Sequence, residues 1–136
     1  FRIERQNLLN ARVLMATSAG FMAIAGVAGS FLPEATLRFT GSEPDTPTVI
    51  LVQVTAALYM GFALLNWMAR GSVIGGIYGR PFIMGNLLHF AVVAALLIKA
   101  SIVHQEIGVV LIAIAYSILA GWFGLVFFTH PGNRKA

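Results

Sequence analysis

Residues 49–98 decide the fold, because two uncharged apolar runs flank a basic turn there. The first run, VILVQVTAALYMGFALLNWMA, covers residues 49–69, and the second, FIMGNLLHFAVVAALLI, covers residues 82–98. Both lengths fall within the roughly 17–25 residues with which a helix crosses a bilayer. The turn between them, RGSVIGGIYGRP (70–81), contains four glycines that let the backbone reverse direction. We therefore predict a helical hairpin that crosses a membrane twice.

Two further apolar runs, residues 13–32 and 107–128, have the same character. The chain has 136 residues, of which 58% are hydrophobic and only 10% charged. Such a composition is typical of a membrane domain and leaves no room for a separate globular one. The predicted fold is all-α: a single domain, residues 1–136, forming an integral membrane four-helix bundle.

The connecting segments carry their own signals. PEATLRF (33–39) predicts a short surface helix stopped by Gly41, and Asp45 or Thr46 is a candidate cap for the second span. Residues 99–106 are expected to form a short loop. The polar lead, residues 1–12, is interpreted as an extension of the first helix, with an interfacial helix as the alternative.

The charge distribution predicts an orientation. The lead, the 70–81 turn and the tail hold seven of the nine Lys and Arg, whereas the other two loops hold one each and four of the five acids. By the positive-inside rule, both termini and the turn at Gly75 should be cytoplasmic, with Glu43 and Gln105 outside. Trp67 and Trp122 would then lie near the inner interface, where indole rings are enriched.

Polar residues inside the predicted spans mark a candidate site. Asn66 and Asn86 lie at nearly the same depth on antiparallel helices, and His89 is one turn beyond Asn86. Thr17 and Ser18 on the first span and Trp122 on the fourth reach a similar depth. This layer is either a polar pocket or a set of interhelical hydrogen bonds, and the second reading is the commoner one. The candidate ligand-binding residues are Asn66, Asn86, His89, Tyr59, Trp122, Arg70 and Arg80.

Several function classes lack the residues they need. There are no cysteines, and no Asp or Glu lies within a predicted span, which argues against thiolate chemistry and carboxylate-based ion transport. A single intramembrane histidine cannot supply two haem ligands or a metal cluster. The basic residues sort by membrane side rather than cluster, so no nucleic-acid partner is expected. Arg70 and Arg80 could hold a lipid phosphate, although solvated boundary charges are the simpler interpretation.

Two passages resemble a known group of proteins. GSFLPEATLRFTG (29–41) closes the first span with a surface helix, and ALYMGFALLNWMARG (57–71) is a glycine-containing second span ending in Arg-Gly. Together they resemble the DoxX-like and related uncharacterised small four-helix membrane proteins of bacteria. The resemblance implies a compact four-helix fold in the bacterial inner (cytoplasmic) membrane. Some members are linked to quinone-coupled oxidation, but no residue set in this chain matches that activity.

The sequence is therefore compatible with two functions. The first is a non-enzymatic membrane subunit that packs against other membrane proteins or itself, with no cofactor. Ala113, Ser117 and Gly121 recur at intervals of four and predict a close helix contact, internal against Ala16–Gly20 or between copies. The alternative is a binder of a lipophilic ligand, a quinone or a lipid, in the cytoplasmic-side polar layer.

Overall fold

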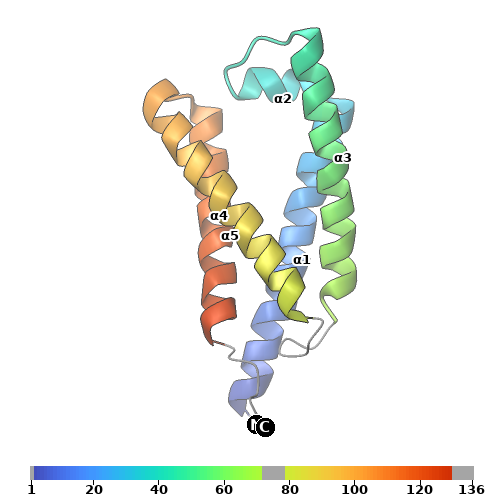
Figure 1. The fold of residues 1–136 in the computed structure, drawn as a ribbon, viewed down its shortest axis with the longest axis vertical. Helices are drawn as coiled ribbons and strands as arrows, with labels where there is room; N and C mark the ends of the chain where they lie inside the picture. The colour runs from blue at the N-terminus through green and yellow to red at the C-terminus, as the bar shows by residue number, and fades with distance from the viewer. Residues whose placement is uncertain (1, 72–78, 130–136) are drawn as a thin grey trace.

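A computed structural model describes residues 2–71 and 79–129, with the backbone alone in residues 2–10. Within these two ranges, five helices follow one another (Figure 1): α1 (Arg2–Phe31), α2 (Pro33–Phe39), α3 (Thr46–Ala69), α4 (Gly79–His104) and α5 (Ile107–Thr129). Most of the predicted 70–81 turn, including Gly75, lies outside the described residues.

Four of the helices are long and apolar enough to cross a membrane: Ala11–Phe31 within α1, and the whole of α3, α4 and α5. The chain is therefore an all-α, multi-pass membrane protein, and the four predicted spans are confirmed as helices. Because the spans alternate in direction, α1 begins and α5 ends at one end of the bundle, and α2 lies at the other end (Figure 1).

The helices extend beyond the apolar runs. α1 begins at Arg2, so the polar lead is a helix extension as interpreted. α4 continues to His104, and the predicted 99–106 loop is wrong: only Gln105 and Glu106 separate α4 from α5. A helix need not end where the hydrocarbon ends, because Lys99 is a good helix former whose long side chain can reach polar surroundings. The chain then turns at Gln105, whose φ is 53°.

The segment between α1 and α3 folds as predicted. α2 is followed by Gly41, whose φ of 77° suits glycine better than other residues. The Asp45 carboxylate accepts a hydrogen bond from the backbone N–H of Thr48 at 3.1 Å and so caps α3. Thr48 also lowers the pKa of Asp45, because hydrogen bonds from its side chain and its backbone favour the ionised carboxylate.

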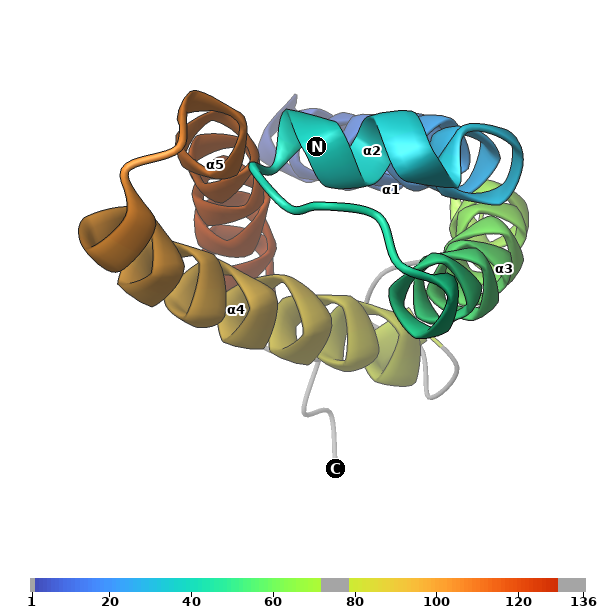
Figure 2. The same ribbon diagram turned by 90° about the horizontal axis from the view of Figure 1, so that it is seen from above.

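The bundle consists of two closely packed pairs, α1 with α3 and α4 with α5. Glycines bring the first pair together: a Cβ added at Gly29 would lie 2.8 Å from the Cβ of Ala56, and one at Gly26 would lie 3.0 Å from the Ala56 carbonyl oxygen. The two pairs meet more loosely. α4 runs diagonally, approaches α3 near the Gly79 end and diverges from it toward α2 (Figures 1 and 2).

The predicted internal seam on the fourth span is wrong. Ala113 is buried, but Gly121 is exposed, and a Cβ added there would meet no atom within 4 Å. The proposed partner surface at Gly20 is equally open. Eight residues of α-helix rotate the side-chain direction by about 80° beyond whole turns, so a four-residue repeat does not stay on one face. The close glycine contact lies on the α1–α3 boundary instead.

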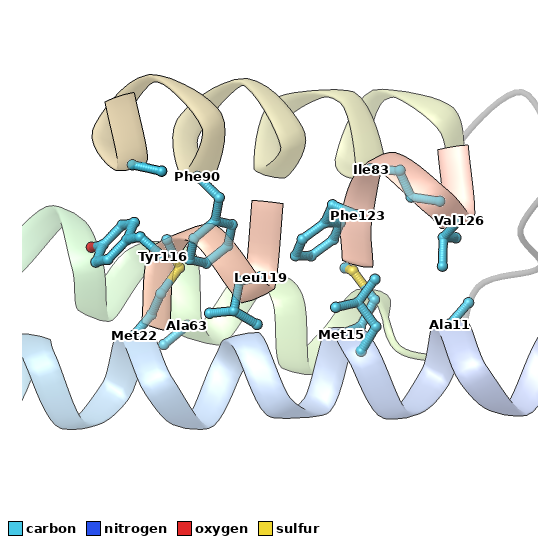
Figure 3. Close-up of a cluster of buried hydrophobic side chains, with 12 residues drawn as sticks. Ala11, Met15, Met22, Ala63, Ile83, Phe90, Tyr116, Leu119, Phe123 and Val126 are labelled. Atoms are coloured by element: carbon cyan, nitrogen blue, oxygen red, sulfur yellow. The ribbon is translucent and has the colours of Figure 1, made fainter. Parts of the chain in front are cut away.

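A buried apolar cluster joins the two pairs (Figure 3). Met15 and Met22 of α1 belong to the same cluster as Phe90 of α4 and Phe123 of α5. The rings of Phe90 and Phe123 stack with centroids 5.5 Å apart. Flexible methionine side chains fill the irregular space beside flat rings, so this cluster holds α1 against the α4–α5 pair.

Candidate functional site

Two asparagines bridge the helix pairs below the middle of the bundle. The Asn66 side-chain amide donates to Asn86 Oδ1 at 2.7 Å, and the Asn86 amide donates back to Asn66 Oδ1 at 2.8 Å. Asn66 also donates to Ser18 Oγ at 3.1 Å, and Asn86 to the Phe82 carbonyl at 2.8 Å. The depth matching of these residues on three helices is thus confirmed.

This amide layer leaves little hydrogen-bonding capacity for a ligand. Asn66 and Asn86 are 1% and 2% exposed, and Ser18 is fully buried. Both amide protons of Asn86 have acceptors, and Ser18 Oγ donates to the Met15 carbonyl at 2.9 Å. Buried polar groups that satisfy one another stabilise the packing of membrane helices. The geometry favours the interhelical hydrogen-bond reading for these three residues.

His89 lies one turn above Asn86 in an aromatic cage. Its ring stacks on Phe62 with centroids 5.8 Å apart and meets Tyr59 edge-on at 5.5 Å. Tyr116 lies at 5.9 Å, and Phe90 at 5.2 Å. His89 Nε2 is buried and has no hydrogen-bond partner in the part of the chain that the structure describes. His89 is therefore the one predicted site residue here with a buried nitrogen still free to bond.

Next to His89, two tyrosine hydroxyls hydrogen-bond to each other across the bundle, Tyr59 from α3 and Tyr116 from α5. Tyr116 is 3% exposed, and Phe21 packs edge-on against its ring at 5.2 Å. The sequence reasoning selected Tyr59 but missed Tyr116. Its depth could have indicated it, since both tyrosines lie near the middle of their spans.

The tyrosine pair lies at the inner end of a cavity of about 700 Å³ beneath α2. Both tyrosines contribute to the wall, and most other lining side chains are apolar, coming from α1, α2, α3 and α5: Phe21, Ile24, Phe39, Leu51, Val52 and Ile112. Among the described lining residues there is no Asp, Glu, Lys or Arg. None of the described residues of α4 lines the cavity, in keeping with the divergence of α4 from α3.

The roof of this cavity is held by a close backbone approach. Phe39, at the end of α2, lines the cavity, and its carbonyl oxygen lies where a Cβ on Gly108 would be placed. Gly108 is the second residue of α5, and only glycine at this position lets the end of α2 rest on it. α2 thus spans from the α1–α3 pair toward α5 (Figure 2).

The remaining predicted site residues lie elsewhere. Trp122 is partly buried against the apolar cluster. The Arg70 guanidinium lies 3.6 Å from the Trp67 ring centroid and donates to the Trp67 carbonyl. Arg70 and Arg12 line a separate surface hollow of about 360 Å³. Arg80 is exposed at the start of α4.

Comparisons with known proteins give no family for this chain. No protein-family model, no curated protein and no solved structure matches it. The resemblance to DoxX-like proteins stays a prediction that depends on residues 29–41 and 57–71 alone. The structure itself shows a small helical membrane protein with four candidate spans and a mainly apolar cavity that ends at two tyrosines.

Proposed function

We propose that this protein binds an uncharged lipophilic molecule of the membrane, such as a quinone or a lipid, in the cavity beneath α2. The observation that carries the proposal is a cavity of about 700 Å³ with an apolar wall between membrane-spanning helices. Small-molecule sites usually measure roughly 300–1,000 Å³ and combine apolar walls with a few polar groups. The cavity has both properties.

The residues that line the cavity also favour a ligand without charge. With no ionisable group other than the two phenols among the described lining residues, nothing in the wall would compensate a charge on the ligand. Moving an unpaired charge into an apolar site is strongly unfavourable. An uncharged molecule meets no such penalty and gains from burial of its apolar surface.

Access from the bilayer is supported by the exposure of the wall. Ile24 and Leu51 both line the cavity, and they are 73% and 65% exposed. The side toward α4 lacks lining residues in the described chain, and α3 and α4 diverge there (Figure 1). A molecule dissolved in the membrane would enter sideways between these helices without crossing water.

This proposal moves the expected ligand site. The alternative derived from the sequence placed the ligand in the layer of Asn66 and Asn86, whose amides bond to each other. The proposed site lies beyond that layer, toward α2, and retains Tyr59 from the original set. The amide layer then has a structural role, because it holds the helices together below the proposed site.

The test is native mass spectrometry of the full chain released from mild detergent, followed by identification of co-purified lipophiles. Ala28 lines the cavity, so Ala28→Phe should fill part of it and reduce the bound fraction. The neighbouring Val27 is 51% exposed and is not among the lining residues, so Val27→Phe is the matched control. Equal retention by both variants, or no lipophile on the wild type, would overturn the proposal.

Packing with other membrane subunits or with a second copy is the second candidate function, and it requires no enzymatic chemistry. The outer face of α5 favours it, because Ile114, Ile118 and Leu125 are exposed beside the open Gly121. Small residues among larger apolar ones let a partner helix approach closely. Ligand binding and packing are compatible, since the cavity and this face are distinct.

The charge distribution supports a location. We place both termini in the cytoplasm, with α2 on the outer side, because seven of the nine Lys and Arg lie in the lead, the 70–81 turn and the tail. The bacterial inner membrane, and kinship with DoxX-like proteins, are proposals supported by the resemblance alone. Labelling of introduced cysteines, described below, tests the orientation.

A further inference from the structure

We infer that the Tyr59–Tyr116 pair recognises the polar group of the ligand, and that this group is an uncharged oxygen, a carbonyl or a hydroxyl. The inference rests on the proposed function, because it assigns a ligand class to the same cavity. It adds a specific hydrogen-bonding site at the inner end of a wall that is otherwise mainly apolar.

The hydrogen-bond count of the pair leaves a donor available. Each tyrosine hydroxyl carries one proton and two acceptor lone pairs. Between Tyr59 and Tyr116, one proton occupies the shared hydrogen bond, and the accepting hydroxyl still has its own proton to donate. A ligand oxygen at the end of the cavity can accept that proton.

His89 packs against the tyrosine pair without lining the cavity. Its ring packs against both tyrosine rings, with centroids 5.5 Å and 5.9 Å away, and its buried Nε2 has no partner among the described residues. His89 thus supports the two tyrosine rings from outside the cavity.

The depth of the pair determines the charge of the ligand group. Tyr59 and Tyr116 lie near the middle of α3 and α5, far from the polar boundary on either side. Ionised groups are costly at the centre of a bilayer, and no cationic or anionic side chain lines the described wall to compensate one. A carboxylate or phosphate is therefore excluded from this end, whereas an uncharged oxygen can be bound there.

Four probes with matched twelve-carbon or thirteen-carbon chains test the inference: dodecanol, methyl undecyl ketone, dodecane and dodecyl sulfonate. The full chain is placed in phosphatidylcholine nanodiscs, and each probe is measured by its excess retention over empty nanodiscs. We expect the alcohol and the ketone to bind about three- to tenfold more tightly than dodecane, the range that one net hydrogen bond provides. The sulfonate should bind no better than dodecane.

Variants locate the effect. The double variant Tyr59→Phe/Tyr116→Phe keeps both rings but removes both hydroxyls, so it should remove the preference for alcohol over dodecane while leaving dodecane binding unchanged; either single variant still has one hydroxyl that can donate. Ser117→Ala is the control, because its hydroxyl bonds to the Ala113 carbonyl of its own helix at 2.7 Å. A direct readout is the ketone carbonyl stretch, which should move to lower frequency on wild-type protein and return in the double Phe variant.

The outcomes separate the two proposals. Equal binding of dodecane and dodecanol would overturn the inference and leave the cavity as a purely apolar site. A preference that persists in the double Phe variant, or tight binding of the sulfonate, would also overturn it. Failure of all four probes to bind would count against the proposed function itself.

Discussion

Asn66 and Asn86 hydrogen-bond to each other in both directions, at 2.7 Å and 2.8 Å, and so tie the α1–α3 pair to the α4–α5 pair. α3 and α4 otherwise contact each other sparsely, and α4 diverges from α3 toward α2 (Figure 1). The amide pair is thus the main polar link at the point where these helices approach. This link holds α3 and α4 together near the start of α4, whereas the two helices lie apart beneath α2 (Figure 1).

A double-mutant cycle measures this link. Asn66→Ala leaves the Asn86 carbonyl oxygen buried without its donor, so we expect the free energy of unfolding to fall by about 1–2 kcal/mol. Asn86→Ala should act similarly, and the double variant should lose less than the sum, with a coupling of about 0.6–1.7 kcal/mol. Reversible unfolding in mixed micelles provides the measurement.

The control for this cycle is Thr17→Ala, which removes a hydroxyl beside Ser18 from an exposed position on α1. It should change stability little. Strictly additive losses for Asn66→Ala and Asn86→Ala would show that the two amides do not stabilise each other.

The α1–α3 contact predicts a rescue experiment. A Cβ at position 29 would lie 2.8 Å from the Ala56 Cβ, so Gly29→Ala should destabilise the protein by about 1–3 kcal/mol through overpacking. Removing the opposing methyl with Ala56→Gly should make the same change cost much less. Gly20→Ala is the control, since no atom lies within 4 Å of a Cβ there. Thermal melts in detergent compare Gly29→Ala, Ala56→Gly, the double variant and Gly20→Ala. A Gly29→Ala protein with an unchanged melting temperature would contradict the close approach.

The sequence was sufficient for the helices because span length and apolar character are local properties. The four spans and the short 33–39 helix follow from residues close together in the chain, and so does the restriction of the α3 cap to Asp45 or Thr46. Depth counting also placed Asn66 against Asn86, since a hairpin of two antiparallel helices fixes which residues are level with each other. The same counting selected both Thr17 and Ser18, but Ser18 is buried in the layer whereas Thr17 is exposed.

Rotation about the helix axes and helix tilt were harder to predict. Whether Gly121 or Gly29 faces a neighbour depends on which face of each helix turns inward, and small residues occur on several faces. The cavity requires α4 to diverge from α3, and no local pattern specifies that tilt. Tyr116 was missed for this reason, because its role depends on facing Tyr59 across the bundle.

The Asp45 cap predicts a response to acid. Hydrogen bonds from Thr48 lower the pKa of Asp45 below its ordinary 3.8, so the ionised form stabilises the folded state. A lowered pKa in the folded state means that this stabilisation is present above the unfolded pKa and is lost as the pH falls through the folded pKa. Asp45→Asn keeps an acceptor that does not titrate. Between about pH 5 and pH 2, wild-type protein should therefore lose more thermal stability than Asp45→Asn, and parallel profiles would contradict the assignment.

Cysteine labelling tests the proposed orientation. The chain has no cysteine, and Glu43, Gln105 and Gly71 are exposed, so a single cysteine at each position is accessible to an impermeant thiol reagent. In intact cells, Glu43→Cys and Gln105→Cys should react, whereas Gly71→Cys should react only after the membrane is permeabilised. The reverse pattern would place the termini outside and overturn the positive-inside assignment.

Association through the outer face of α5 is tested at Gly121. The face is open at this residue, with no atom within 4 Å of an added Cβ, so Gly121→Leu should leave the folded monomer and its melting temperature unchanged. If a partner helix approaches there, the new side chain should block it and lower the associated fraction in cross-linking or single-molecule photobleaching. Gly61→Leu is the control, because Gly61 is equally open but lies on α3. An associated fraction unchanged by Gly121→Leu would remove this face from the packing proposal, since a leucine in place of glycine prevents the backbone approach on which such contacts depend.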